Sequence, residues 1–472
     1  MQLVKRSSGS AASAHGPGSD VTEIASNAAM EALRNLQPPA KGGSPVTDTD
    51  ASMARGVHVR AMLAACLGSS AAATTLGFAS VAMPYIEHET WYDLAGSEPP
   101  DSHWLADSLM LGAAGGALLS GLTLWTFGSR TTMLTSVVGL SVSWIVTAAC
   151  VDLVVLFAAR VSCGLWLGLI TISVSLYVAD VAPAEKRAFY TGLAEAATCF
   201  GIAASCLLEG FSWRLQATAW AAASLSMLGV QRYLIECPRW LNAHGKTHDA
   251  DTAAARLYGL DLPQEFRHSS KAAESTGASL TQLFTSRSIQ TMASVVAEIA
   301  APLAALVMTS MQTGFVVVFA TLTRAAGRRH LLCVSTALIA VCFVVVPPFE
   351  YLTFRQWNLG GAPTETSWVA VYSVNLLVLS YSVGLCHVPA LLTAEMCPGA
   401  GCMHYVCAPV VWAVRWLLAF AVLHYDEDML AFARQDYMSV LLALALLLLC
   451  AVAVCLTPET EGRTLADIDR TA

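Results

Sequence analysis

The sequence has little charge: only 13% of its 472 residues are Asp, Glu, Lys or Arg, whereas 55% are hydrophobic. Soluble proteins carry about 25% charged residues, so this composition excludes an ordinary soluble protein. The net charge of −8 lies largely in the predicted outer loops and tail, and we expect no nucleic-acid partner. Zinc spacings, P-loops, dinucleotide fingerprints and Ser-His-Asp patterns are missing from any supporting context, which predicts no enzyme activity, no catalytic residue, no metal and no cofactor.

Signals of secretion are also missing. The first residues, MQLVKRSSGSAASAHG, lack the apolar core of about 7 to 15 residues that a signal peptide needs. All 14 cysteines fall in predicted membrane spans or at their predicted cytoplasmic side, which argues against a disulfide framework. Residues 1–56 are rich in Ser, Ala, Gly and Asp, and we expect a disordered cytoplasmic tail.

Long apolar runs are what the chain has instead. A helix crosses the hydrocarbon of a bilayer, about 30 Å, with roughly 20 residues. Runs of about this length lie at 60–83, 104–126, 131–150, 153–178, 188–209, 215–235, 331–349, 368–394, 404–424 and 437–456. The sequence therefore predicts an all-α, multi-pass membrane protein.

Lys and Arg are unevenly distributed between the two sides of these spans. Only Arg214, Arg355 and Arg434 fall on one side, together with acidic loops such as YIEHETWYDLAGSEPPDS and YDEDM. Because basic residues accumulate on the cytoplasmic side of membrane proteins, the richer side is predicted to be cytoplasmic. Both termini then lie in the cytoplasm of a protein that we place in the cell membrane.

The segment from 288 to 323 is too short for two full spans. Its 36 residues reach about 54 Å as a helix, whereas two crossings of about 30 Å need about 60 Å before any turn. A single crossing would leave Arg324, Arg328 and Arg329 outside, against the charge rule. We therefore expect two short or re-entrant helices that turn between Pro302 and Ser310.

Three charged patterns occur twice in the same order. FGSRTTML (127–134) corresponds to AGRRHLL (326–332), YVADVAPAEKR (177–187) to LTAEMCPGAGC (392–402), and IECPRWL (235–241) to TPETEGRTL (457–465). This repetition predicts two structurally related halves. Arginines at one helix end can donate charge-assisted hydrogen bonds to carboxylates at another, and such contacts can latch one conformation and release it in another.

These patterns, together with AARVSCG (158–164) and PETEGRTL (458–465), resemble the sugar porter family of the major facilitator superfamily. The stretch DSLMLGAAGGALLSG (107–121) is similar to arthropod trehalose and glucose facilitators. The resemblance implies two six-helix bundles, 57–235 and 287–456, with the seventh helix shortened or re-entrant, a helical cytoplasmic linker 236–286 and a tail 457–472. It also implies a cytoplasmic latch made of Arg130, Asp180, Arg187, Glu236, Arg239, Arg328, Arg329, Glu395, Glu459 and Arg463.

Laid on the family pattern, the substrate contacts fall on Glu195, Gln312, Thr313 and Trp412. An ionisable residue deep in a span is costly unless it faces a wet cavity or a partner, so Glu195 is a functional candidate. The chain departs from the pattern at Ala390 and Val411, where the family has Trp and Asn, and at Arg415. Arg415 can pair with Glu195, with Glu298 or with an anionic substrate.

Two further features are interpreted as structural. Arg160 matches the fourth-span arginine of the family. Gly112, Gly115, Gly116 and Gly121 lie within a span, where they predict close contacts between helices rather than a phosphate loop.

The function implied is facilitative transport of a sugar or similar small polar solute by two rocking bundles, acting as a monomer in the lipid bilayer. Two alternatives stay open: a transport-deficient sensor or receptor-like paralogue, favoured by Ala390, Val411 and the short segment 288–323, and an organic-anion carrier that uses Arg415. Proton coupling is disfavoured because the first span has Ala79 where proton-linked relatives have an acid, although Glu195 leaves it open.

Overall fold

The computed structural model describes residues 48–86, 103–208, 210–258, 302–358, 367–396 and 404–425, with residues 444, 447 and 448. The chain divides into two compact units, Met1–Ala51 and Ser52–Ala472, and the description below concerns the second. Most of the predicted tail, residues 288–301, Glu459 and Arg463 lie outside the described residues.

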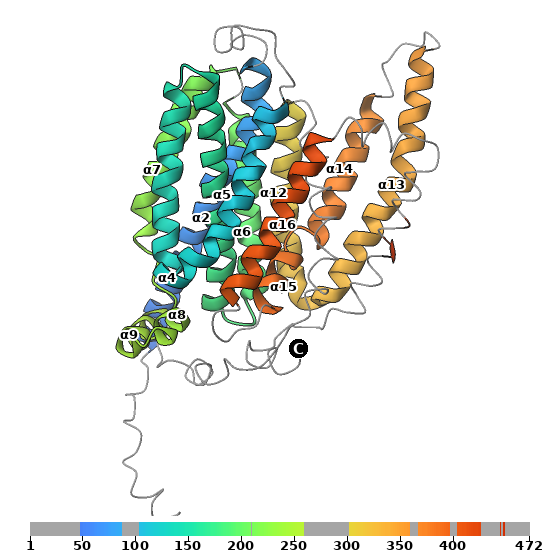
Figure 1. The fold of residues 1–472 in the computed structure, drawn as a ribbon. Helices are drawn as coiled ribbons and strands as arrows, with labels where there is room; N and C mark the ends of the chain where they lie inside the picture. Colours follow the sequence, from blue (N-terminus) through green and yellow to red (C-terminus); the bar gives the residue numbers. More distant parts are fainter. Residues whose placement is uncertain are drawn as a thin grey trace, which may run out of the picture. The chain divides into compact units, whose positions relative to one another are not determined.

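The described residues of the first half form long helices (Figure 1). They are α2 (Asp48–Tyr85), α4 (His103–Ala149), α5 (Leu153–Val181), α6 (Arg187–Cys206) and α7 (Trp213–Gln231). Helix α2 begins at Asp48, inside the stretch that the sequence predicts to be tail. Two short helices follow, α8 (Pro238–Ala243) and α9 (Thr247–Tyr258), within the predicted linker.

The second half contributes α12 (Pro302–Ala326), α13 (Arg328–Asn358), α14 (Ser367–Val383), α15 (Val388–Met396) and α16 (His404–His424). The turn predicted between Pro302 and Ser310 is wrong, because residues 302–326 form one uninterrupted helix. Pro302 begins this helix, where its missing N–H costs nothing. At about 1.5 Å per residue, α12 is long enough for one crossing of the hydrocarbon.

The predicted internal repeat has a backbone counterpart. Gly128 separates two helical parts of α4 with φ 82° and ψ 170°, and Gly327 separates α12 from α13 with φ 76°. Arginine follows each glycine closely, as Arg130 two residues after Gly128 and as Arg328 and Arg329 directly after Gly327. L-residues rarely adopt positive φ, so glycine at both positions allows the chain to break the helix and continue in a new one.

Glycines also set the closest helix contact. A Cβ at Gly112 or Gly116 on α4 would collide with the backbone of α5, and one at Gly164 on α5 would collide with the backbone of α4. Gly121 meets the carbonyl of Tyr405, which brings α4 against α16. The prediction of close helix contacts is confirmed at Gly112, Gly116 and Gly121. It is wrong at Gly115, which faces open space.

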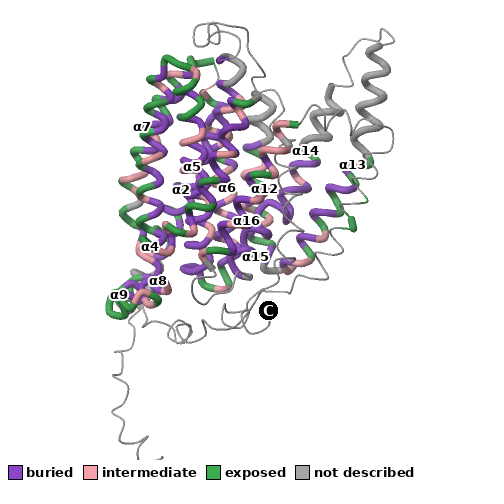
Figure 2. The backbone as a smooth tube through the Cα atoms, in the orientation of Figure 1, coloured by how far each residue is buried: buried purple, intermediate pink, exposed green. Residues whose placement is uncertain are grey.

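The helices bury one face inside the protein and expose apolar side chains on the outside, as contact with lipid requires. Figure 2 shows buried residues on the inward faces of the helices and exposed ones along the outside. The exposed outer residues include large apolar ones: Leu118, Leu122, Val142, Val154 and Leu215. By length and composition, four stretches within the described residues can cross a membrane: Gly56–Ala82, Trp104–Ala149, Leu153–Val181 and Asn375–Glu395.

Candidate functional site

Glu395, near the end of α15, binds two arginines from different parts of the chain. Its Oε1 accepts a hydrogen bond from Nη1 of Arg187 at 3.0 Å, and its Oε2 pairs with Nη1 of Arg328. All three residues are buried, and Arg187 also donates from Nε to the carbonyl of Ala179 at 3.0 Å. Arg187 starts α6 in the first half, whereas Glu395 and Arg328 belong to the second. We call Arg187, Arg328 and Glu395 the latch, and their end of the helices the latch end.

A second ion pair holds the short helices at the latch end. Nη1 of Arg239 on α8 lies 2.9 Å from Oδ1 of Asp180, the penultimate residue of α5. The hydroxyl of Tyr258 on α9 donates to the carbonyl of Val181 at 2.8 Å. The indole of Trp240 donates to the carbonyl of Trp125 on α4 at 2.9 Å. Helices α8 and α9 are therefore fastened to the end of α5 and to α4 just before its break at Gly128.

Glu236 is positioned by backbone amides. Its Oε1 accepts hydrogen bonds from the amides of Arg130 at 3.1 Å and Cys237 at 3.3 Å. A Cβ at Gly128 would lie 2.8 Å from this carboxylate, so glycine is needed there for space as well as for φ. Burial raises the pKa of Glu236, against the hydrogen bonds from these amides, which lower it. Arg130 contributes its main chain to this contact, and its side chain is exposed.

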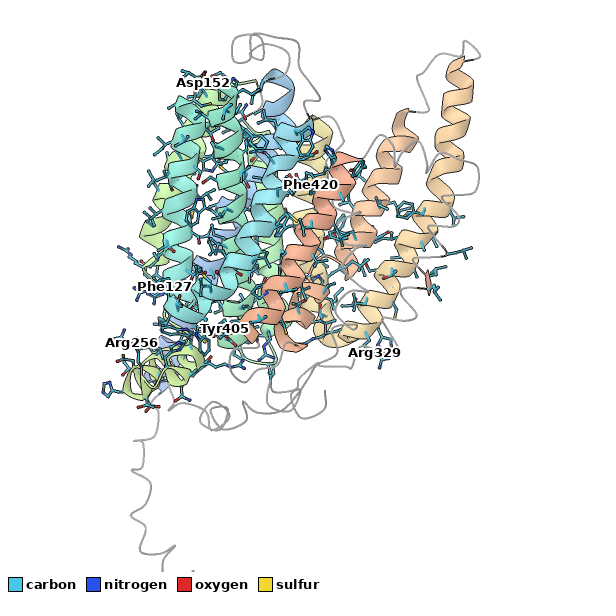
Figure 3. All side chains as sticks on the ribbon, viewed as in Figure 1. Phe127, Asp152, Arg256, Arg329, Tyr405 and Phe420 are labelled. Atoms are coloured by element: carbon cyan, nitrogen blue, oxygen red, sulfur yellow. The ribbon has the colours of Figure 1, made fainter. Side chains whose placement is uncertain are left out.

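Basic residues gather at the latch end (Figure 3). The view places Arg256, Arg329 and Tyr405 at this end and Asp152 at the opposite end. Arg329 is partly exposed. Of the ten predicted latch residues, Arg187 and Arg328 both pair with Glu395, Asp180 pairs with Arg239, and Glu236 accepts from the amide of Arg130.

Deeper in the protein, Glu195 on α6 and Arg415 on α16 interact electrostatically across the two halves. The pairing of Arg415 with Glu195 was one of the alternatives open from the sequence, and Glu298 lies outside the described residues. The Arg415 guanidinium lies over the ring of Trp412, 4.7 Å from its centroid, and 5.9 Å from that of Trp416. Both tryptophans are buried, whereas Glu195 and Arg415 are partly exposed.

Gln312 and Thr313 lie at a different depth. Helix α12 packs against α6, with Ala320 against Gly192. Gln312 is 15 residues before Gly327 (327 − 312) and thus about 22 Å from the latch end, whereas Glu195 is eight residues after Arg187 (195 − 187), or about 12 Å. Both α12 residues are partly exposed, and the Thr313 hydroxyl donates to the carbonyl of Thr309 at 2.7 Å.

The apolar run 368–394 is not one continuous helix. Residues 384–387 form turns between α14 and α15, and the Ser335 hydroxyl of α13 accepts a hydrogen bond from the freed amide of Leu385 at 3.2 Å. Tyr381 precedes this break and Cys386 lies within it, and both interact electrostatically with Glu195 and Arg415. Broken helices form the binding sites of many carriers. Gly384 and Pro389 were the available sequence signals for the break.

Sequence reasoning missed two contacts of histidine. Nδ1 of His424 lies 3.0 Å from Oδ2 of Asp107, which joins α16 to α4 at the end opposite the latch. Nε2 of His387 lies 3.0 Å from the hydroxyl of Thr323, which joins the helix break to α12. Ionisable residues inside predicted spans were the signal that could have identified both.

Arg160 is fully buried in α5 and faces α2. Its Nη1 donates to the carbonyl of Thr75 at 3.3 Å, and its guanidinium lies 5.5 Å from the ring centroid of Phe78. These contacts are consistent with the structural role expected for it.

The fold is that of the major facilitator superfamily. The proton:xylose symporter XylE of E. coli, bound to 6-bromo-6-deoxy-D-glucose, matches it with a TM-score of 0.71 at 16% sequence identity. The match covers 88% of this chain and 99% of that one. This likeness shows the fold of the chain.

The family model "Sugar (and other) transporter" matches residues 61–303 and 293–472, and the chain belongs to this family of transporters, which are not enzymes. The facilitated trehalose transporter Tret1 of Drosophila virilis is 21% identical over 466 residues, covering 91% of this chain and 50% of the relative. The chain thus spans about half the length of that relative. The probable plastidic glucose transporter 3 of Arabidopsis thaliana is 27% identical over 417 residues, covering 80% of this chain and 81% of the relative.

Proposed function

We propose that this chain carries a sugar or similar small polar solute across the cell membrane by facilitated diffusion. Its two bundles, residues 57–235 and 287–456, alternate between states open to either side. The observation that carries this proposal is the ion pair of Arg187 with Glu395, 3.0 Å long and buried. It ties a first-half helix to a second-half helix at the latch end, as a gate that closes this face of a carrier requires.

The solute contacts that we propose are Glu195, Gln312, Thr313 and Trp412. Glu195, Gln312 and Thr313 remain partly exposed within the protein, and they offer hydrogen-bond acceptors and donors suited to hydroxyl groups. Trp412, at about the depth of Glu195, offers an aromatic surface, although Arg415 already covers one part of it. A small polar solute would contact groups from both halves, so that its binding favours their approach.

Uptake into vesicles tests the function. We expect labelled glucose or trehalose to enter vesicles that hold the protein, and Glu195→Ala to abolish uptake while surface expression stays intact. Absence of flux for sugars and for a panel of anions would instead indicate a sensor. Anion flux that Arg415→Ala abolishes would indicate an organic-anion carrier, an alternative that loses support because Glu195 faces Arg415.

The latch end is proposed to be cytoplasmic, together with the linker 236–286 and both tails, 1–56 and 457–472. The arginines gathered there support this orientation under the charge rule. His330 is exposed beside the latch end, and Val151 is exposed at the opposite end. In intact cells, an impermeant thiol reagent should label V151C above the wild-type background and leave H330C unlabelled. Labelling of H330C from outside would overturn the orientation.

A further inference from the structure

Three segments bring ionisable or polar groups to one depth of the protein. Measured from the latch end, Glu195 lies about 12 Å along α6 and Arg415, 11 residues after His404 (415 − 404), about 16 Å along α16. Val388, the first residue of α15, is seven residues before Glu395 (395 − 388) and thus about 10 Å from it, and Cys386 lies two residues further from the latch. The α14–α15 break therefore lies level with the two charges.

Glu195 and Arg415 interact electrostatically but form no contact ion pair. Each interacts electrostatically with the other and with Tyr381 at the helix break. No N···O distance within 4 Å joins Glu195 to Arg415, both of which the structure describes. Trp412 and Trp416 stabilise the guanidinium through their ring faces but carry no charge that could neutralise it. Glu195 is thus the acidic residue that interacts with Arg415 in this region, and its ionised form offsets the charge of the guanidinium.

We propose that the Glu195 and Arg415 pair makes the site selective for uncharged polyhydroxy solutes, and that Glu195 is the residue that excludes anions. A neutral hydroxyl can donate to the carboxylate and accept from the guanidinium while leaving both charges in place. A carboxylate-bearing solute drawn to Arg415 would meet the like charge of Glu195 in a medium of low dielectric. A cationic solute would meet Arg415 in the same way. This inference rests on the proposed function.

Three hexoses of similar shape and different charge test the proposal: glucose, glucuronate and glucosamine. With the wild-type protein in proteoliposomes, we expect glucose uptake to exceed that of glucuronate and of glucosamine at least tenfold. Glu195→Gln keeps the hydrogen-bonding capacity but removes the negative charge. It should raise the ratio of glucuronate to glucose uptake at least tenfold, and Arg415→Gln should do the same for glucosamine. The control is Glu185→Gln, an exposed residue outside the pair, which should change neither ratio.

Ligand-induced thermal stabilisation of the purified variants separates this inference from the proposed function. Glucuronate should stabilise E195Q, whose arginine has lost its counter-charge, and should not stabilise the E195Q/R415Q double variant, in which neutrality is restored. If E195Q does not fold, glucosamine with R415Q gives the mirror-image test. A wild type that takes up no sugar overturns the proposed function, whichever way glucuronate acts on E195Q. Two results would overturn the selectivity role. One is wild-type protein that takes up or binds glucuronate, or a zwitterion such as alanine, as well as it does glucose. The other is an E195Q protein whose stability and uptake do not respond to glucuronate.

Discussion

Glu395 on α15 and Arg187 on α6 lie 208 positions apart in the sequence, and their side chains form a buried hydrogen bond of 3.0 Å. The second oxygen of the carboxylate pairs with Arg328, so one acid holds two guanidinium groups. Removal of one partner of a buried pair leaves the other charge without compensation, and such a loss costs about 3–5 kcal/mol.

The first prediction concerns this carboxylate. Glu395→Gln should destabilise the latched conformation by about 3–5 kcal/mol because two arginines lose their counter-charge. The midpoint of thermal unfolding in detergent should fall, and sugar flux should fall with it because the latched state is no longer favoured. Glu185→Gln, made at an exposed glutamate, serves as the control. Unchanged unfolding and unchanged flux in E395Q would remove the latch from the mechanism.

The second prediction concerns the contact of α6 with α12. A Cβ at Gly192 would collide with the Cβ of Ala320, which is 2% exposed. Gly192→Val should therefore cost about 1–3 kcal/mol through overpacking and reduce flux by holding the two helices apart. Ala320→Gly added to Gly192→Val should restore part of the lost stability, measured by thermal unfolding, and part of the lost flux, measured by uptake. Failure of this second substitution to compensate would mean that the two residues do not meet.

The third prediction compares two glycines with positive φ, Gly128 at 82° and Gly210 at 88°. Alanine at either position is strained by about 1–2 kcal/mol. Gly128→Ala carries an added cost, because its ψ of 170° falls in a region that essentially only glycine occupies and because its Cβ would meet Glu236. Nothing lies within 4 Å of a Cβ at Gly210. G128A should thus lower the unfolding midpoint more than G210A, and equal effects would contradict the contact.

The fourth prediction is a pH dependence. Because burial raises the pKa of Glu236 above its ordinary value of 4.5, the folded protein takes up this proton at a higher pH than the unfolded chain. The free energy of unfolding contributed by this group therefore rises as the pH falls from the raised value toward 4.5, and it is lost as the pH rises again. Relative to Glu236→Gln, which cannot titrate, the wild type should gain thermal stability as the pH is lowered toward 4.5. A pH-independent difference between the two proteins would contradict the raised pKa.

The sequence predicts the local backbone of some residues but not the partners of their side chains. The glycine turns before Arg130 and Arg328 are visible as a repeated local pattern, since positive φ and the end of a helix depend on neighbouring residues. The same pattern does not reveal that Arg130 donates its backbone amide to Glu236, whereas Arg328 pairs its guanidinium with Glu395. The uninterrupted α12 was missed because the length argument treated the segment from 288 to 323 by itself.

By itself, the sequence determined an all-α membrane protein, the order of its apolar helices, its repeated charged patterns and its membership of a transporter family. Hydrophobicity and chain chirality act over a few residues and can be read along the chain. Only the tertiary structure decided that Glu395 serves two arginines, that Asp107 meets His424, and that the α14–α15 break lies level with Glu195 and Arg415. These contacts join residues far apart in the chain, and they depend on how closely the glycine-bearing helix faces approach one another.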